Sequence, residues 1–291
     1  MMRSLKNISA FCVIALPFTV VPAHAAMTID SSAYALSASL SAANAVLVNV
    51  GPLAASSGSA PGAYSDSASL LTIDQNLQLA GFGLLDVRQQ LSTGVVQSSA
   101  SSPYPVAPTG MASAGINGLD VGLSTQALFL PPITVLGISA DTLLSTTSVS
   151  AENGLSAIGS TTIEGLDLTG LGLGGLLFDG SLFVNPDPNT VLLDLLGLKI
   201  VLNEQIWSGD GVTDIGLATN ALRVTFDDFL LGGNLVSGDI VLGHSQASIS
   251  GYEITPPTSP VPEPASWALM IAGFGLVGGA ARMRRVRPAM A

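Results

Sequence analysis

The sequence predicts an all-β protein, a single domain of many short antiparallel strands arranged as a sandwich or a barrel-like fold. Apolar and polar residues alternate in many short runs along the body of the chain, which is the period of a half-buried strand. Turn-forming residues separate these runs at intervals of about 8–12 residues, a spacing typical of sandwiches and barrels and not of βαβ units. The sequence has no strict repeat, which argues against a regular β-helix.

In the first half of the body, glycine, serine and proline separate the strand signals. The predicted strands lie at residues 34–40, 45–50, 70–73 and 77–79. Loops are predicted at residues 56–61 and 98–109, of which the second contains three prolines. The stretch 84–91 is the exception, because the spacing of Leu84, Val87 and Leu91 predicts one or two helical turns.

In the second half of the body, the strand signal is stronger. Strands are predicted at residues 116–123, 127–130, 133–138, 142–149, 160–168, 182–184, 198–202, 220–226, 239–242 and 247–249, with a further apolar run from Val191. Clusters of Asn, Asp, Gly and Pro predict turns at residues 152–154, 185–189 and 208–211.

Charge is segregated along the chain. The chain has a formal net charge of −11, yet between residues 26 and 260 only Arg88, Lys199 and Arg223 are basic, against nineteen acidic residues. A nucleic-acid-binding surface needs clustered cations that face phosphates. This composition therefore excludes nucleic acid from the expected partners.

The N-terminus has the pattern of a secretory signal peptide. Arg3 and Lys6 precede an apolar run over residues 8–21, and Ala23-His24-Ala25 follows it. This pattern predicts cleavage after Ala25 and a mature chain that begins at Ala26. A first transmembrane helix is the alternative, but the apolar run is short and is interrupted by Pro17.

Cleavage at this position limits the chemistry of the mature chain. It removes the single cysteine, Cys12, and one of the two histidines, and only His244 is left. The mature chain then has no disulfide, thiolate nucleophile or multi-histidine metal site. The predicted domain that follows spans residues 26–254.

The C-terminus has three parts in order. A Pro-rich spacer (255–261) leads into residues 262–268, an apolar stretch (267–281) and an arginine cluster (282–287). The arginines favour the cytoplasmic side of a membrane, so the apolar stretch is predicted to be a transmembrane helix with the body outside. The stretch is barely long enough to span a bilayer and is rich in glycine.

The C-terminal residues resemble the PEP-CTERM sorting signal in its PEPxxWA form. The residues that carry the resemblance are Pro262, Glu263, Pro264, Trp267 and Ala268, followed by Arg282, Arg284, Arg285 and Arg287. The resemblance implies recognition and cleavage by exosortase, an integral-membrane enzyme of Gram-negative bacteria. It also implies export, an inner-membrane-tethered intermediate, delivery to the cell surface or extracellular matrix, and association with exopolysaccharide or biofilm matrix.

The body resembles the choice-of-anchor surface proteins, among which group P is a candidate. The blocks that carry this resemblance are residues 202–205, 219–224 and 239–247. The resemblance implies an extracellular β domain and brings no activity or catalytic residues.

Several residues are candidates for chemistry, each with a structural alternative. Residues 170–175 match GxGxxG, with Asp194 nineteen residues further on, but no strand–helix context for a dinucleotide follows. The adjacent carboxylates of Asp227 and Asp228 point to opposite faces of a strand, so they cannot converge on one glycosidic bond. His244, beside Ser245, is the one base available to a Ser-His-Asp triad, and it equally suits a hydrogen-bonded surface position.

Two further candidates lie in or beside turns. Asp187, and the pair Asp210 and Asp214, belong to oxygen-rich turns that suit structural calcium or solvated Asx turns. Trp207 suits stacking on a sugar or the edge of the core.

These observations predict an exported, non-catalytic protein of the cell surface or exopolysaccharide matrix, without a cofactor. Its expected partners are signal peptidase, the secretion machinery, an exosortase-like enzyme and exopolysaccharide. An exported polysaccharide hydrolase and a carbohydrate-binding module are the alternatives. Whether the protein is finally tethered or released stays open at this point.

Overall fold

The computed structural model describes residues 27–253, except 43–44, 83–84, 128–129, 171–183 and 232–233, together with residues 270–275 and 277. The chain divides into two compact units, Met1–Tyr252 and Glu253–Ala291. The strands all lie in the first unit. In the second, residues 270–275 and 277 are helical.

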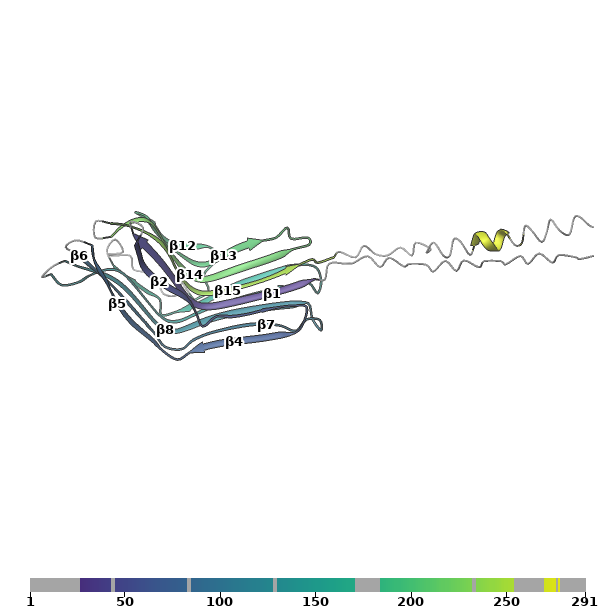
Figure 1. Cartoon of the computed structure of the whole chain (residues 1–291), viewed down its shortest axis with the longest axis horizontal. Helices are drawn as coiled ribbons and strands as arrows, with labels where there is room; N and C mark the ends of the chain where they lie inside the picture. The colour runs from purple at the N-terminus through teal and green to yellow at the C-terminus, as the bar shows by residue number, and fades with distance from the viewer. Residues whose placement is uncertain are drawn as a thin grey trace, which may run out of the picture. The chain divides into compact units, whose positions relative to one another are not determined.

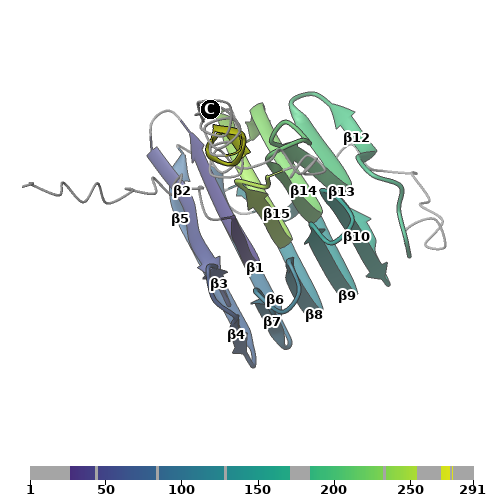
Figure 2. The same cartoon turned by 90° about the vertical axis from the view of Figure 1, so that its right-hand side faces the viewer.

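The first unit is a sandwich of two antiparallel sheets, which face each other in two layers (Figures 1 and 2). The all-β prediction is therefore confirmed, and the described sheets form a sandwich and not a closed barrel. The seven-stranded sheet comprises β1 (Thr28–Ala42), β2 (Ala45–Leu53), β3 (Ser56–Ser59), β12 (Thr190–Leu195), β13 (Leu198–Ser208), β14 (Ile215–Leu231) and β15 (Asn234–Ser250). The eight-stranded sheet comprises β4 (Tyr64–Leu70), β5 (Ile73–Phe82), β6 (Leu85–Thr93), β7 (Val96–Ser102), β8 (Thr109–Ala127), β9 (Ile133–Ser150), β10 (Ser156–Glu164) and β11 (Asp167–Thr169).

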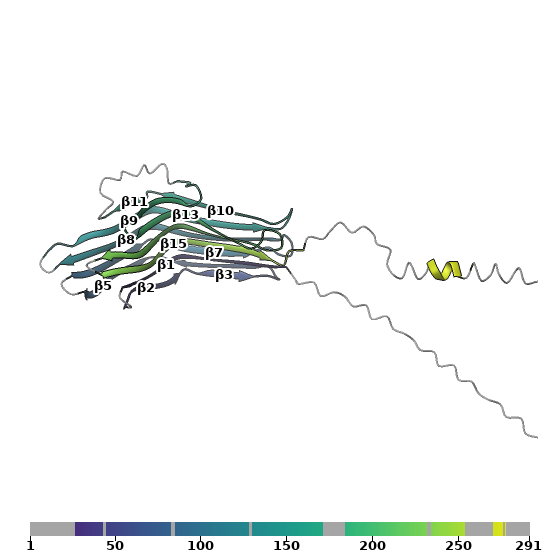
Figure 3. The same cartoon turned by 90° about the horizontal axis from the view of Figure 1, so that it is seen from above.

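The first and last strands of the body are neighbours. The order of the seven-stranded sheet is β12-β13-β14-β15-β1-β2, with β3 also on β1. Strand β15 pairs with β1 from Thr28 opposite Ser250 to Ala42 opposite Val236, and Figure 3 shows the two running side by side. Strand β15 therefore joins two parts of the sheet that are distant in sequence.

The long strands bend near their middle, toward the side of the seven-stranded sheet (Figure 1). At the bend, Ala35, Gly243, Ala221 and Asn203 lie at the same level on β1, β15, β14 and β13. Buried side chains change phase there: on β15 they are odd-numbered from 245 to 249 and even-numbered at 240 and 242. Gly243 has φ 62° and Asn203 has φ 47°, a left-handed conformation that kinks the strands.

The bend divides the core into two halves that differ in composition. We call the half that contains the two ends of the body, Thr28 and Ser250, the near half, and the half beyond the bend the far half. The far half is packed with large aliphatic and aromatic side chains, which include Leu40, Ile138, Ile200, Leu242 and Phe226. The near half has small or polar side chains at its centre and a smaller apolar cluster around Ile29 and Ile249 at its end.

Hydrogen bonds between the two sheets cross the near half. The Thr147 hydroxyl oxygen on β9 lies 2.9 Å from Thr219 Oγ1 and 2.8 Å from Ser245 Oγ, on β14 and β15. Ser98 on β7 donates to Ser56 on β3 at 2.8 Å. These residues are all buried, so each hydroxyl that contacts another replaces the water it loses on folding.

The structure corrects the element boundaries that the sequence predicts. Residues 84–91 do not form a helix, since β6 begins at Leu85 and pairs with β5 and β8. Residues 98–102 and 56–59, predicted as loop, belong to β7 and β3. Residues 71 and 72 connect β4 to β5 instead of forming a strand.

Several predicted pairs of short strands are single long strands. The predicted strands 133–138 and 142–149 are both part of β9, and 239–242 and 247–249 are both part of β15. The predicted turns at 152–154 and 208–211 do separate β9 from β10 and β13 from β14. Residues 182–183 lie outside the described residues.

Candidate functional site

A row of polar side chains crosses the seven-stranded sheet beside the bend, on its outer face. Tyr34 pairs with His244, His244 with Asn220, and Asn220 with Glu204, so that the row spans β1, β15, β14 and β13. The bend makes this face of the sheet concave (Figure 1). The inward neighbours Ala33, Thr219 and Ser245 are buried in the core, so the side chains of the row point to the concave face. We call this set, with Arg223, Thr225 and Asp239, the bend network.

Hydrogen bonds connect the row from one strand to the next. The Tyr34 and His244 rings stack, with centroids 4.4 Å apart and an angle of 19° between their planes. His244 Nδ1 lies 2.7 Å from Asn220 Oδ1, and Asn220 Nδ2 donates to Glu204 Oε2 at 2.7 Å. Because the amide nitrogen of Asn220 faces Glu204, its oxygen is the acceptor and Nδ1–H of His244 is the donor.

Arg223 links the two carboxylates of the bend network. Its Nη1 donates to both oxygens of Glu204, at 3.2 and 3.3 Å, and its Nε donates to Asp239 Oδ1 at 3.1 Å. Thr225 also donates to Asp239 Oδ1, at 2.8 Å. The hydrogen bond to Asp239 raises the pKa of Arg223, partial burial opposes this shift, and the charges of Glu204 and Asp239 add to it.

The surroundings of His244 favour its neutral form over its charged form. Burial lowers its pKa, and a hydrogen bond with Gln246 and the charge of Glu204 oppose the shift in part. The neighbouring Ser245 points into the core, where its hydroxyl contacts Thr147. Adjacent residues of a strand face opposite ways, so the structure does not bring the predicted Ser245 and His244 together.

The adjacent carboxylates Asp227 and Asp228 are both exposed, at an irregularity of β14 between Phe226 and Phe229. Asp228 Oδ1 accepts a hydrogen bond from the Ser237 hydroxyl at 3.0 Å. The structure places neither carboxylate in the bend network.

The predicted calcium residues lie in two turns. The Asp210 carboxylate accepts backbone hydrogen bonds from Asp214, Val212 and Thr213 at 2.8–2.9 Å, which hold the pKa of Asp210 well below its usual range. Asp214 accepts hydrogen bonds from the Thr213 hydroxyl and from Gly251 N–H. These carboxylates therefore fasten the turn 209–214 and connect it to the end of β15.

The other turn is separate from this one. The backbone carbonyl of Asp187 accepts a hydrogen bond from the Thr190 hydroxyl at 2.7 Å, and its side chain is exposed. In the described ranges, no three His, Cys, Asp or Glu side chains are grouped as metal ligands usually are. Calcium binding stays a prediction for both turns.

Trp207 lies near the end of β13 and is 57% exposed, so it is not enclosed by the core. Of the glycine-rich motif at 170–175, only Gly170 is described; residues 171–175 lie outside the described residues.

Sequence reasoning missed the bend network as a unit. The alternation of the predicted strand 220–226 puts Arg223 on the face opposite Leu222 and Val224, and Leu222 and Val224 are buried while Arg223 is not. One local signal could have indicated it. The alternation of apolar and polar residues is interrupted at Gly243 and Asn203, and each is followed by a polar residue of the network, His244 and Glu204.

The predicted signal peptide and the predicted sorting motif lie at the two ends of the chain. The signal-peptide residues Ala23, Ala25 and Ala26, the motif residues 262–268 and the arginine cluster 282–287 lie outside the described residues. In the second unit, the described helical side chains Met270, Ile271, Phe274 and Val277 are 60–73% exposed. A search of the described part of the chain finds no helix with the length and apolarity needed to cross a membrane.

The fold and the C-terminal pattern together define a class: an acidic β-sandwich with a sorting tail. Residues 260–285 match the PEP-CTERM protein-sorting motif, which confirms the resemblance and covers Pro262–Ala268, Arg282, Arg284 and Arg285. This motif implies an exported surface protein that exosortase processes and sorts. Comparison with curated proteins and with solved structures found no match, so no family is identified for the body.

Proposed function

We propose that the body is a non-catalytic component of the cell surface or of the extracellular polysaccharide matrix, delivered there by its PEP-CTERM motif. The observation that carries the proposal is the bend network. Its acidic and basic groups are hydrogen-bonded to one another, as Glu204 and Asp239 are to Arg223. These ion pairs and hydrogen bonds connect neighbouring strands at the bend, which favours a structural role for the groups over proton transfer.

The outer face of the eight-stranded sheet supports the same proposal. Five hydroxyl side chains form one row across β4, β7, β8, β9 and β10: Ser67, Ser99, Ser113, Thr146 and Ser160. Ser99 and Ser113 hydrogen-bond each other at 2.8 Å, as do Thr146 and Ser160 at 2.7 Å. A neutral hydroxyl surface is well hydrated, which suits a protein embedded in polysaccharide.

A polysaccharide hydrolase is the competing function, and Glu204 and Asp239 are the observation in its favour. They are two carboxylates on one face, and glycoside hydrolysis uses a pair of carboxylates. Arg223 lies between them and donates to both, which favours a structural role for the pair.

The test compares a strain that lacks this protein with one that produces it. The proposal predicts that the protein is recovered with the matrix or the outer surface, and that its loss reduces the polysaccharide retained by the cells. Matrix polysaccharide incubated with surface-recovered protein should keep its chain-length distribution, measured by size-exclusion chromatography. Shortening of the polymer that stops in a Glu204→Gln variant would establish the hydrolase instead.

A further inference from the structure

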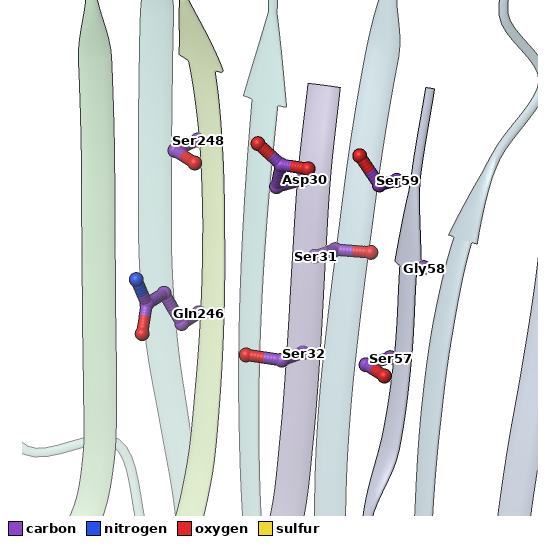
Figure 4. Close-up of a pocket in the computed structure, with 8 residues that line it drawn as sticks. All are labelled: Asp30, Ser31, Ser32, Ser57, Gly58, Ser59, Gln246 and Ser248. Atoms are coloured by element: carbon purple, nitrogen blue, oxygen red, sulfur yellow. The ribbon is translucent and has the colours of Figure 1, made fainter. Parts of the chain in front are cut away.

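A hollow lies on the outer face of the seven-stranded sheet, between the bend network and the near end of the sandwich. It has a volume of about 420 Å³ and lies over β15, β1 and β3. Two rows of side chains line it, with β1 in the middle of each: Ser248, Asp30 and Ser59 in one, and Gln246, Ser32 and Ser57 in the other. Figure 4 shows these side chains on three adjacent strands.

The hollow follows from short side chains on a rigid base. Serine at four of the six outward positions leaves space between Asp30 and Gln246, whose side chains are longer. Beneath it, Tyr64 of the other sheet hydrogen-bonds Ser31 at 2.8 Å, and its ring occupies the space beside Gly58. This contact between the sheets holds β1 and β3 in place under the hollow.

The lining of the hollow contains both hydrogen-bond donors and hydrogen-bond acceptors. The serine hydroxyls donate and accept, and the Gln246 amide does both with two fixed groups. The Asp30 carboxylate only accepts, and among the described residues nothing donates a hydrogen bond to it. Gln246 already hydrogen-bonds His244, and the Ser59 hydroxyl donates to the Ala60 carbonyl at 3.2 Å. The side chains of Asp30, Ser32, Ser57 and Ser248 form no hydrogen bond among the described residues. An incoming ligand with several hydroxyl groups therefore finds these four side chains, and the second polar group of the Gln246 amide, available to it.

The charge and polarity of this region select among ligand classes. The three basic residues of the body all lie in the far half, so an anionic ligand would meet Asp30 without a compensating cation. No apolar side chain lines the hollow, which disfavours a lipid or an aromatic ligand. Calcium prefers several carboxylate and carbonyl ligands, and Asp30 is the one carboxylate in the lining, which disfavours a calcium site.

We propose that this hollow binds a neutral glycan, as a short segment of a polysaccharide whose hydroxyls donate to Asp30 and exchange hydrogen bonds with Gln246 and Ser32. The volume falls within the range of small-molecule sites. One step toward the bend on the same face, the Tyr34 and His244 pair adds an aromatic ring on which a further sugar can pack. The inference deepens the proposed matrix function, since it names the ligand class and the place where it binds.

The test uses processed protein recovered from a host that contains exosortase. Affinity electrophoresis through gels that contain neutral glucan, galactan or mannan measures binding, with a uronic acid polymer as the charged comparator. The proposal predicts that at least one neutral polymer retards the protein and that the uronic acid polymer does not. Failure of every neutral polymer to retard it, or retardation by the charged polymer alone, would refute the site.

Two matched variants locate the binding. Ser32→Arg fills the hollow and pairs with Asp30, and should weaken binding about tenfold or more. Ser99→Arg adds the same side chain to the outer face of the other sheet, and should leave binding unchanged. Gln246→Ala provides a second, smaller perturbation if Ser32→Arg unfolds the protein. Equal binding by wild type and hollow variants, or equal loss in Ser32→Arg and Ser99→Arg, contradicts the proposal.

The same variants separate this site from the wider function. Recovery of Ser32→Arg protein in the matrix, with glycan binding intact, overturns the site and leaves the matrix function standing. Absence of wild-type protein from surface and matrix, with glycan binding through the hollow preserved in vitro, overturns the matrix function alone.

Discussion

The two halves of the sandwich are held together by different interactions, although long strands such as β9, β14 and β15 run through both. In the far half, Leu242 and Phe226 bury large apolar side chains between the sheets. In the near half, the equivalent centre contains Thr147, Thr219 and Ser245, which hydrogen-bond between the sheets. Apolar packing is non-directional and grows with area, whereas hydroxyl bonds require one spacing and orientation of the sheets.

This difference has a consequence for the outer surface. The near half supports the hollow at Asp30, and short core side chains such as Ala33 and Ala112 allow its sheets to lie close together. The far half contains most of the buried apolar residues. We therefore expect truncation to be most harmful in the far half and enlargement to be most harmful in the near half.

The largest loss of folding stability is expected from Phe226→Ala. Phe226 is one of the largest fully buried side chains, and it contacts Phe229 edge-on with ring centroids 5.8 Å apart. Its removal leaves a cavity and should lower the free energy of unfolding by about 3–5 kcal/mol. Denaturant titration of the purified body measures this loss. A cost below about 1 kcal/mol would mean that the far half does not dominate stability.

Enlargement in the near half is tested by Gly159→Ala. A Cβ atom at Gly159 would collide with the Thr219 hydroxyl, and it would lie 3.1 Å from a Leu217 methyl. The expected loss is about 1–3 kcal/mol, because the two sheets must move apart. Gly115→Ala is the control, since its Cβ would meet only ordinary contacts at 3.5–3.6 Å. Equal stability of the two variants in thermal unfolding would refute close packing of the near half.

A smaller effect is expected from Thr147→Val. The change keeps the shape of the side chain and removes the hydroxyl that contacts Thr219 and Ser245, at an expected cost of about 1–2 kcal/mol. Thr146→Val, one residue away on the outer face, removes only the bond to Ser160 and should cost less than about 0.5 kcal/mol. If both variants lose the same stability, the hydroxyls between the sheets have no special role.

The smallest change in folding stability is expected from the protonation of His244 as pH falls. Burial lowers the folded-state pKa of His244 below its ordinary value of 6.5. Stability from the neutral form is therefore complete above pH 6.5 and declines as pH falls from there through the lowered folded-state pKa. His244→Phe keeps a ring against Tyr34 and should flatten the dependence between pH 7.5 and 5. An unchanged slope in this variant would show that the pKa of His244 is the same in the folded and unfolded states.

The sequence predicts the fold class because alternation and turn residues are local signals. It does not predict that β15 is continuous, because Gly243 and its neighbours interrupt the alternation at the bend and resemble a turn. Residues 84–91 mislead for a related reason. The inward face of β6 includes the polar Gln89 and Thr93, so its alternation is hidden and the leucine spacing suggests a helix.

The functional sites also differ in how far they can be predicted from local sequence. The PEP-CTERM motif is contiguous in sequence and is visible without a structure. The bend network and the hollow are not, since Tyr34 meets His244 and Asp30 meets Ser248 only through the pairing of the first strand with the last. Cross-strand neighbours more than two hundred residues apart leave no local pattern.

The intact mass of the protein recovered from the cell surface tests the central claim most directly. We expect a chain that begins at Ala26 and ends near Pro262–Pro264, without the arginines at 282–287. A variant with Pro262, Glu263 and Pro264 changed to alanine keeps the apolar stretch and should accumulate at full length in the inner membrane. Surface-recovered wild-type protein that still carries the arginine cluster would contradict processing, and the tail would then be a simple anchor.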